Sequence, residues 1–479
     1  MSSPNELTIA EAQELMAKDE LSSRQLVQAC LDQIRAVDPK IHAFLEVYEE
    51  DALKAADRAD DRRSKGQSLG ELDGIPVALK DNILVQGKRA TAASKILATH
   101  ISASDATVTR KLIESGAVII GKTNLDEFAM GSSTEHSAFG PTLHPRDQER
   151  VAGGSSGGSA AAVTTHMCLA ALGSDTGGSI RQPAAFCGIV GFKPTYGRVS
   201  RSGLMAMASS FDQIGPLTKS VRDSAAVFQA IQGQDVLDQT TSDHASFVPA
   251  WTENDSGQPL RGIRIGLPRQ AWGKGIGEGV RQEVERAIEK LRSLGAEIKE
   301  VDLPYADEAL AVYYVLMPCE VSANLARFDG MRYGLRKESL PLFETYAASR
   351  AEGFGPEARR RILLGTYALS RGYYDAYYLQ AKKVQTLIRQ GYEAAFREVD
   401  VLLTPTTPDV AFKVGEKAND PLAMYLEDIF TVGVNVAGLP ALSVPCGETQ
   451  GLPVGMHFTG SWFHEAQLLA IADVYERHH

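Results

Sequence analysis

Two glycine- and serine-rich elements near the middle of the chain decide how this sequence can fold. Residues 153–159 read GGSSGGS, and residues 173–183 read GSDTGGSIRQP. Glycines before a serine allow successive backbone N–H groups to point at one spot, where they can stabilise a developing oxyanion. Residues 160–172 between the elements are small and apolar, which predicts a buried helix and strand. Taken alone, the two elements leave open a catalytic site or a plain loop.

The residues after Ser179 can begin a helix, because Pro183 is tolerated near a first helical turn. A helix that begins there would aim its N-terminus at the glycine-serine elements. The partial positive charge of that N-terminus would favour negative charge at the same place.

A serine nucleophile needs a base, and none of the ten histidines lies in these elements. Lys80 is the notable candidate, because it ends the apolar run 75–79. A lysine that acts as a base near neutral pH must lose about three pKa units, which burial can supply. The sequence also allows a second interpretation, in which Lys80 only pairs with Asp81.

The flanking sequence alternates between apolar strands and helices, which predicts an α/β protein with a sheet covered on both faces. Strands are predicted at 75–79, 117–120, 264–267, 297–301, 401–404 and 442–445, and Val85 is a possible further strand start. Helices are predicted from Thr8, from Ser22, and at 50–65, 104–115 and 278–294.

One large domain is predicted for residues 1–479. Its expected parts are N-terminal helices (1–65), a core (66–235), a polar loop (236–260) and a C-terminal part (261–479) with a helical insertion at about 309–397.

The composition is that of a globular enzyme with little affinity for nucleic acid of its own. The net charge of −11 argues against a large basic surface. The five cysteines are widely spaced and predict reduced core thiols. No apolar run long enough to span a bilayer and no signal-peptide core are evident, so we expect a cytoplasmic protein.

Residues 116–123, GAVIIGKT, fit the phosphate-binding pattern G-x-x-x-x-G-K-[ST]. That function needs a loop after a strand. The middle residues are apolar and β-branched, and they favour a buried strand instead. We therefore reject a nucleotide site here.

The glycine-serine elements together with Lys80 resemble the amidase signature family of serine hydrolases, most specifically between Leu72 and Pro216. In that family the serine of T-G-G-S-I-R is the nucleophile, which corresponds to Ser179. The first serine of G-G-S-S-G-G-S bridges nucleophile and base, and it corresponds to Ser155. The lysine of P-V-x-x-K-D/E is the base, which corresponds to Lys80.

The resemblance also implies a fold and a reaction. The fold is a large central mixed sheet with helices on both faces, and the reaction is acyl transfer from a carboxamide. The oxyanion donors implied are the backbone N–H groups of Thr176, Gly177, Gly178 and Ser179.

Within that family, residues 121–131, 209–216, 326–334 and 360–370 are similar to the glutamine-hydrolysing subunits of tRNA-dependent amidotransferases. There the α-carboxylate of glutamine is held by an arginine that corresponds to Arg361, and its α-amine by an aspartate that corresponds to Asp428. A nearby tyrosine corresponds to Tyr313, or alternatively to Tyr314. His136 departs from the pattern, because relatives usually carry asparagine there.

The narrower resemblance implies no cofactor or metal in this chain. It implies a partner, the B subunit of the amidotransferase, that uses ATP and Mg²⁺ to activate aminoacyl-tRNA and receives ammonia, and a small C subunit that braces the two. The tRNA is expected to bind mainly through the partner. The alternatives are a stand-alone amidase for a small or fatty amide, and a non-catalytic nucleotide-binding or scaffold protein. The pair Arg361 and Asp428 argues against the first, and the intact triad against the second.

Overall fold

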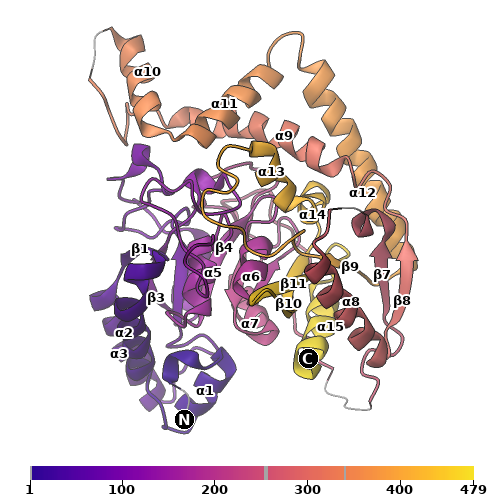
Figure 1. Cartoon of the computed structure of the whole chain (residues 1–479). Coiled ribbons are helices and arrows are strands. Elements are labelled where there is room, and N and C mark those ends of the chain that lie inside the picture. Colours follow the sequence, from indigo (N-terminus) through magenta and orange to yellow (C-terminus); the bar gives the residue numbers. More distant parts are fainter. Residues whose placement is uncertain (1–2, 253–256, 274, 339–340) are drawn as a thin grey trace.

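A computed structural model describes residues 3–252, 257–273, 275–338 and 341–479 (Figure 1). Its described strands form one sheet in the order β1-β3-β2-β4-β6-β5-β10-β11-β9-β7-β8. These strands are β1 (Phe44–Val47), β2 (Pro76–Lys80), β3 (Val118–Thr123), β4 (Ala170–Asp175), β5 (Val190–Lys193), β6 (Gln213–Thr218), β7 (Arg264–Pro268), β8 (Glu297–Val301), β9 (Val401–Pro405), β10 (Ala441–Thr449) and β11 (Leu452–Gly460).

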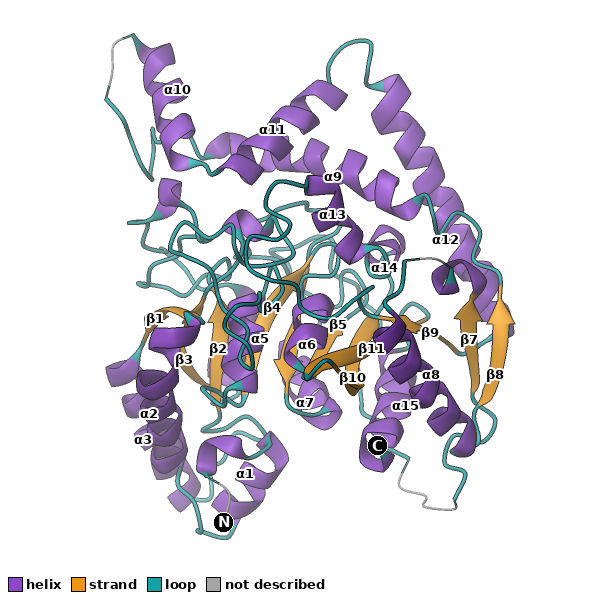
Figure 2. Ribbon diagram, viewed as in Figure 1, coloured by secondary structure: helices purple, strands orange, loops and turns teal. Residues whose placement is uncertain are grey.

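The sheet is mixed, as predicted. Strand β2 pairs in parallel with β3 and β4, whereas β4 pairs antiparallel with β6, and β10 antiparallel with β5 and β11. Strands from residues 66–235 and from residues 261–479 share this one sheet (Figure 2). We therefore propose that the chain folds as a single domain.

Helices pack on both faces of the sheet, as predicted. Helices α5 and α6 pack together and on strands β4, β5 and β11, whereas α4, α7 and α15 form a second group that contacts β3, β6 and β11. The helices are α1 (Ile9–Ala17), α2 (Ser23–Ile41), α3 (Glu49–Ser64), α4 (Thr107–Glu114), α5 (Gly157–Thr164), α6 (Arg181–Cys187), α7 (Val221–Ile231), α8 (Glu278–Ser293), α9 (Ala309–Asn324), α10 (Leu342–Gly353), α11 (Pro356–Ala368), α12 (Gln380–Glu398), α13 (Pro421–Tyr425), α14 (Val432–Ala437) and α15 (Glu465–His478).

Short 3₁₀ or π segments complete the described secondary structure. They are η1 (Pro4–Glu6), η2 (Lys95–Leu97), η3 (Glu127–Ala129), η4 (Arg269–Trp272), η5 (Leu325–Arg327), η6 (Asp375–Leu379) and η7 (Leu426–Asp428).

The predicted strands and helices form within a few residues of their expected bounds, but four strands, β1, β5, β6 and β11, were not predicted. Strand β6 contains Gly215 and Pro216, and β11 carries a proline and a glycine, so both look like turns in sequence. Each is nevertheless buried along its length. Strand β1 is short and lies at the sheet edge. The possible strand at Val85 is wrong, because the chain there forms only an isolated bridge between Ile83 and Leu204.

The phosphate-loop interpretation of residues 116–123 is excluded by β3. Gly121, Lys122 and Thr123 are strand residues, and Lys122 is buried in an ion pair with Asp81 at 2.8 Å. The interpretation that Lys80 only pairs with Asp81 is wrong, because Asp81 forms its ion pair with Lys122 instead.

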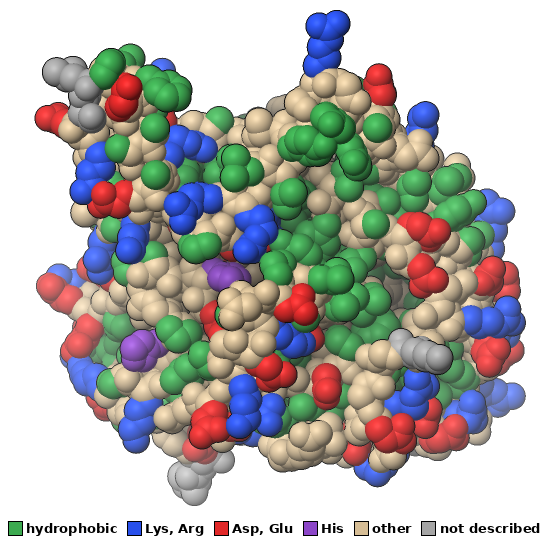
Figure 3. All heavy atoms as spheres, turned by 45° about the horizontal axis from the view of Figure 1, so that its top comes forward, with side chains coloured by type: hydrophobic (Ala, Val, Ile, Leu, Met, Phe, Trp, Pro, Cys, Tyr) green, Lys and Arg blue, Asp and Glu red, His purple; other side chains and the backbone are tan. Residues whose placement is uncertain are grey.

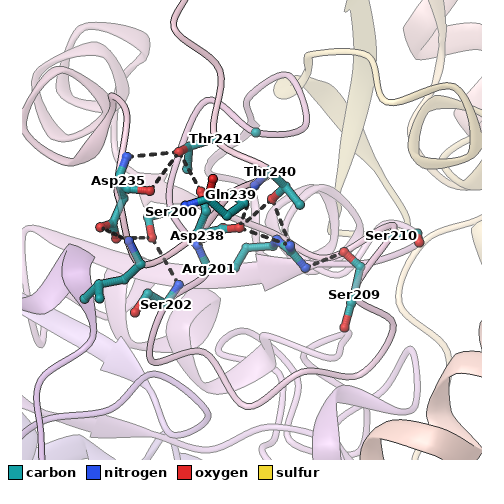
Figure 4. A network of polar contacts seen from close by, with 12 residues as sticks. Ser200, Arg201, Ser202, Ser209, Ser210, Asp235, Asp238, Gln239, Thr240 and Thr241 are labelled. Carbon is teal, nitrogen blue, oxygen red and sulfur yellow. Dashed lines mark hydrogen bonds and ion pairs between the residues drawn. The ribbon is translucent and has the colours of Figure 1, made fainter.

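The predicted polar loop is anchored rather than free in its first part. Ser200 donates to Asp235 at 2.6 Å, and the backbone N–H of Arg201 donates to Asp238 at 2.9 Å (Figure 4). The described residues between α7 and β7 form no helix or strand, as predicted, while residues 253–256 of this loop lie outside the described residues. All five cysteines are buried and unpaired, which agrees with core thiols.

Helices α9 to α12 form the predicted helical insertion and extend across the top of the view in Figure 1. Contrary to expectation, Ala309–Arg327 has the length and mean hydropathy (1.3) of a membrane span. Half of that window is buried, and α9 packs on α11, α12 and α14, as the core helix of a globular protein does.

We expect Gly365→Ala to separate α11 from α9. An added Cβ would lie 1.8 Å from the carbonyl oxygen of Pro318, a backbone atom that cannot turn aside. The free energy of unfolding should fall by about 1–3 kcal/mol, despite the better helix propensity of alanine. Gly273→Ala is the control, since its Cβ would approach nothing nearer than 3.8 Å. Equal thermal stability of the two variants would contradict this packing.

Candidate active site

Lys80 and the second glycine-serine element lie together at the carboxyl ends of the interior strands β2 and β4. Lys80 ends β2 and Asp175 ends β4, and because these strands are parallel, their carboxyl ends lie side by side. The backbone then turns through residues 176–180 into α6, as the sequence predicted for the residues after Ser179.

The amine of Lys80 is fully buried among serine hydroxyls. Its Nζ lies 2.7 Å from Oγ of Ser155, 2.8 Å from Oγ of Ser156 and 3.0 Å from Oγ of Ser174. Burial lowers the pKa of Lys80 to about 7, although the negative charges of three buried aspartates oppose the shift. A substantial fraction of the amine is therefore neutral near pH 7 and able to accept a proton.

Ser179 is the most exposed of the three predicted triad residues, at 8%, compared with 0% for Lys80 and Ser155. Its backbone carbonyl accepts a hydrogen bond from the N–H of Ser156 at 3.1 Å. The two glycine-serine elements are thereby joined directly. Ser156 and Ser174 were not singled out by the sequence, since only the fold brings them to Lys80.

A buried ion pair that sequence reasoning missed holds the loop that bears Ser179. Arg181 donates two hydrogen bonds to the carboxylate of Asp175, at 3.0 and 2.9 Å, and both side chains are 0% exposed. Burial alone would raise the pKa of Asp175, but the charge and hydrogen bonds of Arg181 hold it well below its usual range. The same carboxylate accepts the N–H groups of Gly178 and Ile180.

The predicted oxyanion donors lie on this loop, but one of them is already bonded. Gly178 donates its N–H to Asp175 at 3.0 Å, so an oxyanion would rely on the remaining donors, at Thr176, Gly177 and Ser179. Both glycines are required sterically. A Cβ on Gly177 would lie 2.8 Å from the hydroxyl of Tyr313, and one on Gly178 would lie 2.3 Å from the hydroxyl of Thr431.

The first glycine-serine element is tightly packed against the loop that follows β3. The peptide bond between Gly154 and Ser155 is cis. A Cβ on Gly154 would lie 2.2 Å from the carboxylate of Asp126, which accepts the N–H groups of Thr134 and His136. Sequence reasoning gave no role to Asp126, whose partners are non-consecutive residues.

Arg361 lies on α11 and is buried, at 3% exposure. Its Nε donates to Glu357 at 2.8 Å, and its guanidinium lies 5.5 Å from the ring of Tyr314 and 5.4 Å from that of Tyr425. One terminal nitrogen, Nη1, lies 3.7 Å from the sulfur of Met317, a weak acceptor, so the terminal nitrogens keep donor capacity for a carboxylate. Glu357 is a positioning residue that the sequence did not reveal. It also lines a polar cavity of about 470 Å³ together with His136.

Asp428 lies on η7, close to the oxyanion loop. A Cβ on Gly178 would come within 3.3 Å of its carboxylate. Asp428 accepts hydrogen bonds from Ser132 at 2.8 Å and from Tyr314 at 3.4 Å. Burial raises the pKa of Asp428 to about 7, although the hydrogen bond from Ser132 and the charge of Arg361 oppose the shift. Of the two tyrosines that the sequence left open, Tyr313 contacts Gly177 and Tyr314 contacts Asp428.

The chain matches the family model Amidase over residues 25–469. It belongs to the amidase signature family. Two relatives of high identity are A subunits of glutamyl-tRNA(Gln) amidotransferase. The protein from Moorella thermoacetica is 54% identical over 472 residues, covering 98% of this chain and 96% of the relative. The protein from Prochlorococcus marinus is 54% identical over 98% of this chain and 97% of the relative. The predicted family and its narrower branch are thus confirmed.

Solved amidase-family structures share this fold with different activities. The A subunit of glutamyl-tRNA(Gln) amidotransferase from Thermotoga maritima has a TM-score of 0.80 and 44% identity, covering 98% of this chain and 94% of that one. Peptide amidase from Stenotrophomonas maltophilia has a TM-score of 0.81 but only 33% identity, covering 98% and 96%. The fold alone therefore does not distinguish substrates.

We expect Arg181→Met to be strongly destabilising, because it leaves the carboxylate of Asp175 buried without its cation. The free energy of unfolding should fall by about 3–5 kcal/mol. Arg292→Met removes the exposed ion pair with Glu289 on α8, and it should cost at most about 1 kcal/mol. Denaturant unfolding of both variants measures the difference, and similar losses would contradict the role given to Arg181.

Proposed function

We propose that this chain hydrolyses glutamine to glutamate and ammonia, as the glutaminase subunit of a tRNA-dependent amidotransferase. The observation that carries the proposal is a pair of buried, opposite charges: Asp428 lies beside the loop of Ser179, and the charge of Arg361 acts on Asp428. Arg361 offers a fork for a carboxylate, and Asp428 offers an anion for an ammonium. Glutamine carries both groups at its α-carbon, whereas a simple aliphatic amide carries neither.

The proposed chemistry is acyl transfer through a serine. Neutral Lys80 accepts a proton from Ser155, which in turn accepts the proton of Ser179 as its oxygen attacks the carboxamide carbon. The N–H groups of Thr176, Gly177 and Ser179 stabilise the oxyanion, and the returning proton converts the leaving amine into ammonia. Water then attacks the acyl-enzyme by the same proton route and releases glutamate. The hydrogen bond between Lys80 and Ser155 and the lowered pKa of Lys80 support this order.

The ammonia is proposed to pass to a partner, which converts Glu-tRNA(Gln), Asp-tRNA(Asn) or both into the amidated forms. This partner is the B subunit, which uses ATP and Mg²⁺, and a small C subunit braces the pair. The proposal is supported by the identity of about half of all residues to A subunits of that enzyme. The net charge of −11 is consistent with tRNA binding mainly to the partner.

We expect Ser179→Ala to reduce kcat for ammonia release from glutamine by at least about 10³-fold, since the nucleophile is lost. Arg361→Ala should reduce kcat/KM for glutamine by about 10²-fold while leaving the slow hydrolysis of propionamide unchanged, because only glutamine presents an α-carboxylate. Ammonia release is measured with the co-expressed partner subunits. If Arg361→Ala leaves glutamine turnover intact, or if simple amides are the better substrates, a stand-alone amidase replaces this proposal.

We expect activity to fall as the pH drops below about 7. Lys80 loses its basic form by protonation, and Asp428 loses its negative charge, and the pKa of each is about 7. For propionamide, log(kcat/KM) should fall with a slope of about 1, because only Lys80 matters. For glutamine the slope should approach about 2, and Asp428→Asn should return it to about 1. If the two amides give equal slopes in the wild type, Asp428 does not take part in glutamine binding.

A further inference from the structure

A second cavity, of about 550 Å³, lies on the other side of the segment that carries Asp428. It is formed by the β7–η4 connection, the start of α9, and the segment from α13 to α14. Hydrophobic side chains gather in the middle of the face drawn in Figure 3. The apolar lining of the cavity includes Leu303, Ala306, Ala309, Leu426, Ile429 and Phe430.

A helical stripe extends the apolar surface from the cavity wall, at Leu426 and Ile429, to Leu422 outside the cavity. Leu422, Leu426 and Ile429 follow one another at helical spacing along α13 and η7 and are 63%, 41% and 41% exposed. Large aliphatic side chains that share one exposed helical face are costly in water unless another surface covers them. Because Leu422 lies outside the cavity lining, an occupant that covers the whole stripe must extend past the cavity.

Three acidic side chains and one basic side chain, Lys417, line the same groove. Asp307 and Asp409 are exposed, and Glu427 is 3% exposed. One carboxylate oxygen of Glu427 bonds to Lys417, while Oε2 is buried with no hydrogen-bond partner among the described residues. A buried acceptor without a donor is unfavourable, so the groove offers a position for an incoming cationic donor.

The side chains of segment η7 therefore contribute to two different sites, the candidate active site and the groove. Asp428 accepts a hydrogen bond from Ser132 and lies next to Gly178 in the loop of Ser179. The residues before and after it, Glu427 and Ile429, line the groove. A molecule in the groove would lie directly behind the residue proposed to hold the α-amine of glutamine.

We propose that this groove, bounded by Leu422, Leu426 and Ile429 and by Asp307, Asp409 and Glu427, docks a segment of the partner subunit. The segment presents apolar side chains with at least one Lys. The inference rests on the proposed function, which requires a partner. Charge argues against two other occupants of the groove. A second copy of this chain carries the same net charge of −11, and an anionic membrane would be repelled by the acidic side chains of the groove.

The first test is zero-length carbodiimide cross-linking of the wild-type chain with its purified partner subunits, followed by mass spectrometry. This reagent joins a carboxylate only to an amine in contact with it. We expect links from Asp307 or Asp409 to a lysine in an apolar segment of a partner. A complex whose cross-links all avoid these two residues and Glu427 would overturn the inference.

The second test is the dissociation constant of the complex for the double variant Asp307→Lys, Leu422→Asp. We expect it to rise at least tenfold, or about 1.4 kcal/mol, because charge and apolar contacts are both reversed. The matched control is Asp61→Lys, Leu69→Asp, at an exposed aspartate and a leucine 49% exposed outside the groove. Neither double variant alters a residue of the proposed active site, so basal ammonia release should be unchanged and reports correct folding.

The outcomes separate the two proposals. If the wild-type chain releases ammonia from glutamine and binds the partner, and the groove variant binds equally well, the groove inference fails while the proposed function stands. If the wild type neither hydrolyses glutamine nor binds the partner, the proposed function itself fails. A loss of partner affinity confined to the groove variant supports the inference.

Discussion

The active-site region depends on one buried ion pair, Asp175 with Arg181. Asp175 ends β4 and Arg181 begins α6, so the pair closes the loop between them. Arg181 also donates to the carbonyl of Thr431 and to Asn435, which ties the C-terminal part of the chain to this loop. Because every strong donor and acceptor of the pair is satisfied, the loop has a fixed conformation that water cannot readily disturb.

This fixed loop explains why small residues surround Ser179. Gly177 packs against Tyr313, and Gly178 against Thr431, and no side chain fits in either place. The side chains of Tyr313 and Thr431 therefore approach the backbone of this loop closely. The burial of Lys80 also has a chemical consequence. Desolvation destabilises its charged form and lowers its pKa to about 7, so the neutral amine is available as a base near neutral pH.

The two residues proposed to hold glutamine, and the neighbour Ser132, come from segments that are distant in sequence. Arg361 comes from α11, Asp428 from η7, and Ser132 from the loop after β3. Each is oriented by a neighbour, and Glu357 holds Arg361 by a hydrogen bond to Nε. The segment from α13 to η7 is shared between this site and the exposed apolar groove, so partner docking and glutamine binding would act on the same short stretch of chain.

Patterns within the chain were sufficient to predict the fold class, most helices and most strands, because apolar spacing reports which face is buried. They failed for β6 and β11, where proline and glycine suggest turns but burial inside the sheet decides. The candidate triad and the glutamine-contact residues came from resemblance of short motifs, and their catalytic roles await the experiments above.

The sequence by itself determined that glycine and serine cluster where a backbone must turn sharply, and that a lysine ends an apolar strand. Only the tertiary structure decided what surrounds them. The contacts of Lys80 with Ser156 and Ser174, the pairing of Asp81 with Lys122, the link between Asp175 and Arg181, and the exposed stripe at Leu422 all depend on the fold. Hydrogen bonds and desolvation act over a few ångströms in space, and most of these distances are set by strand order and helix packing rather than by separation along the chain.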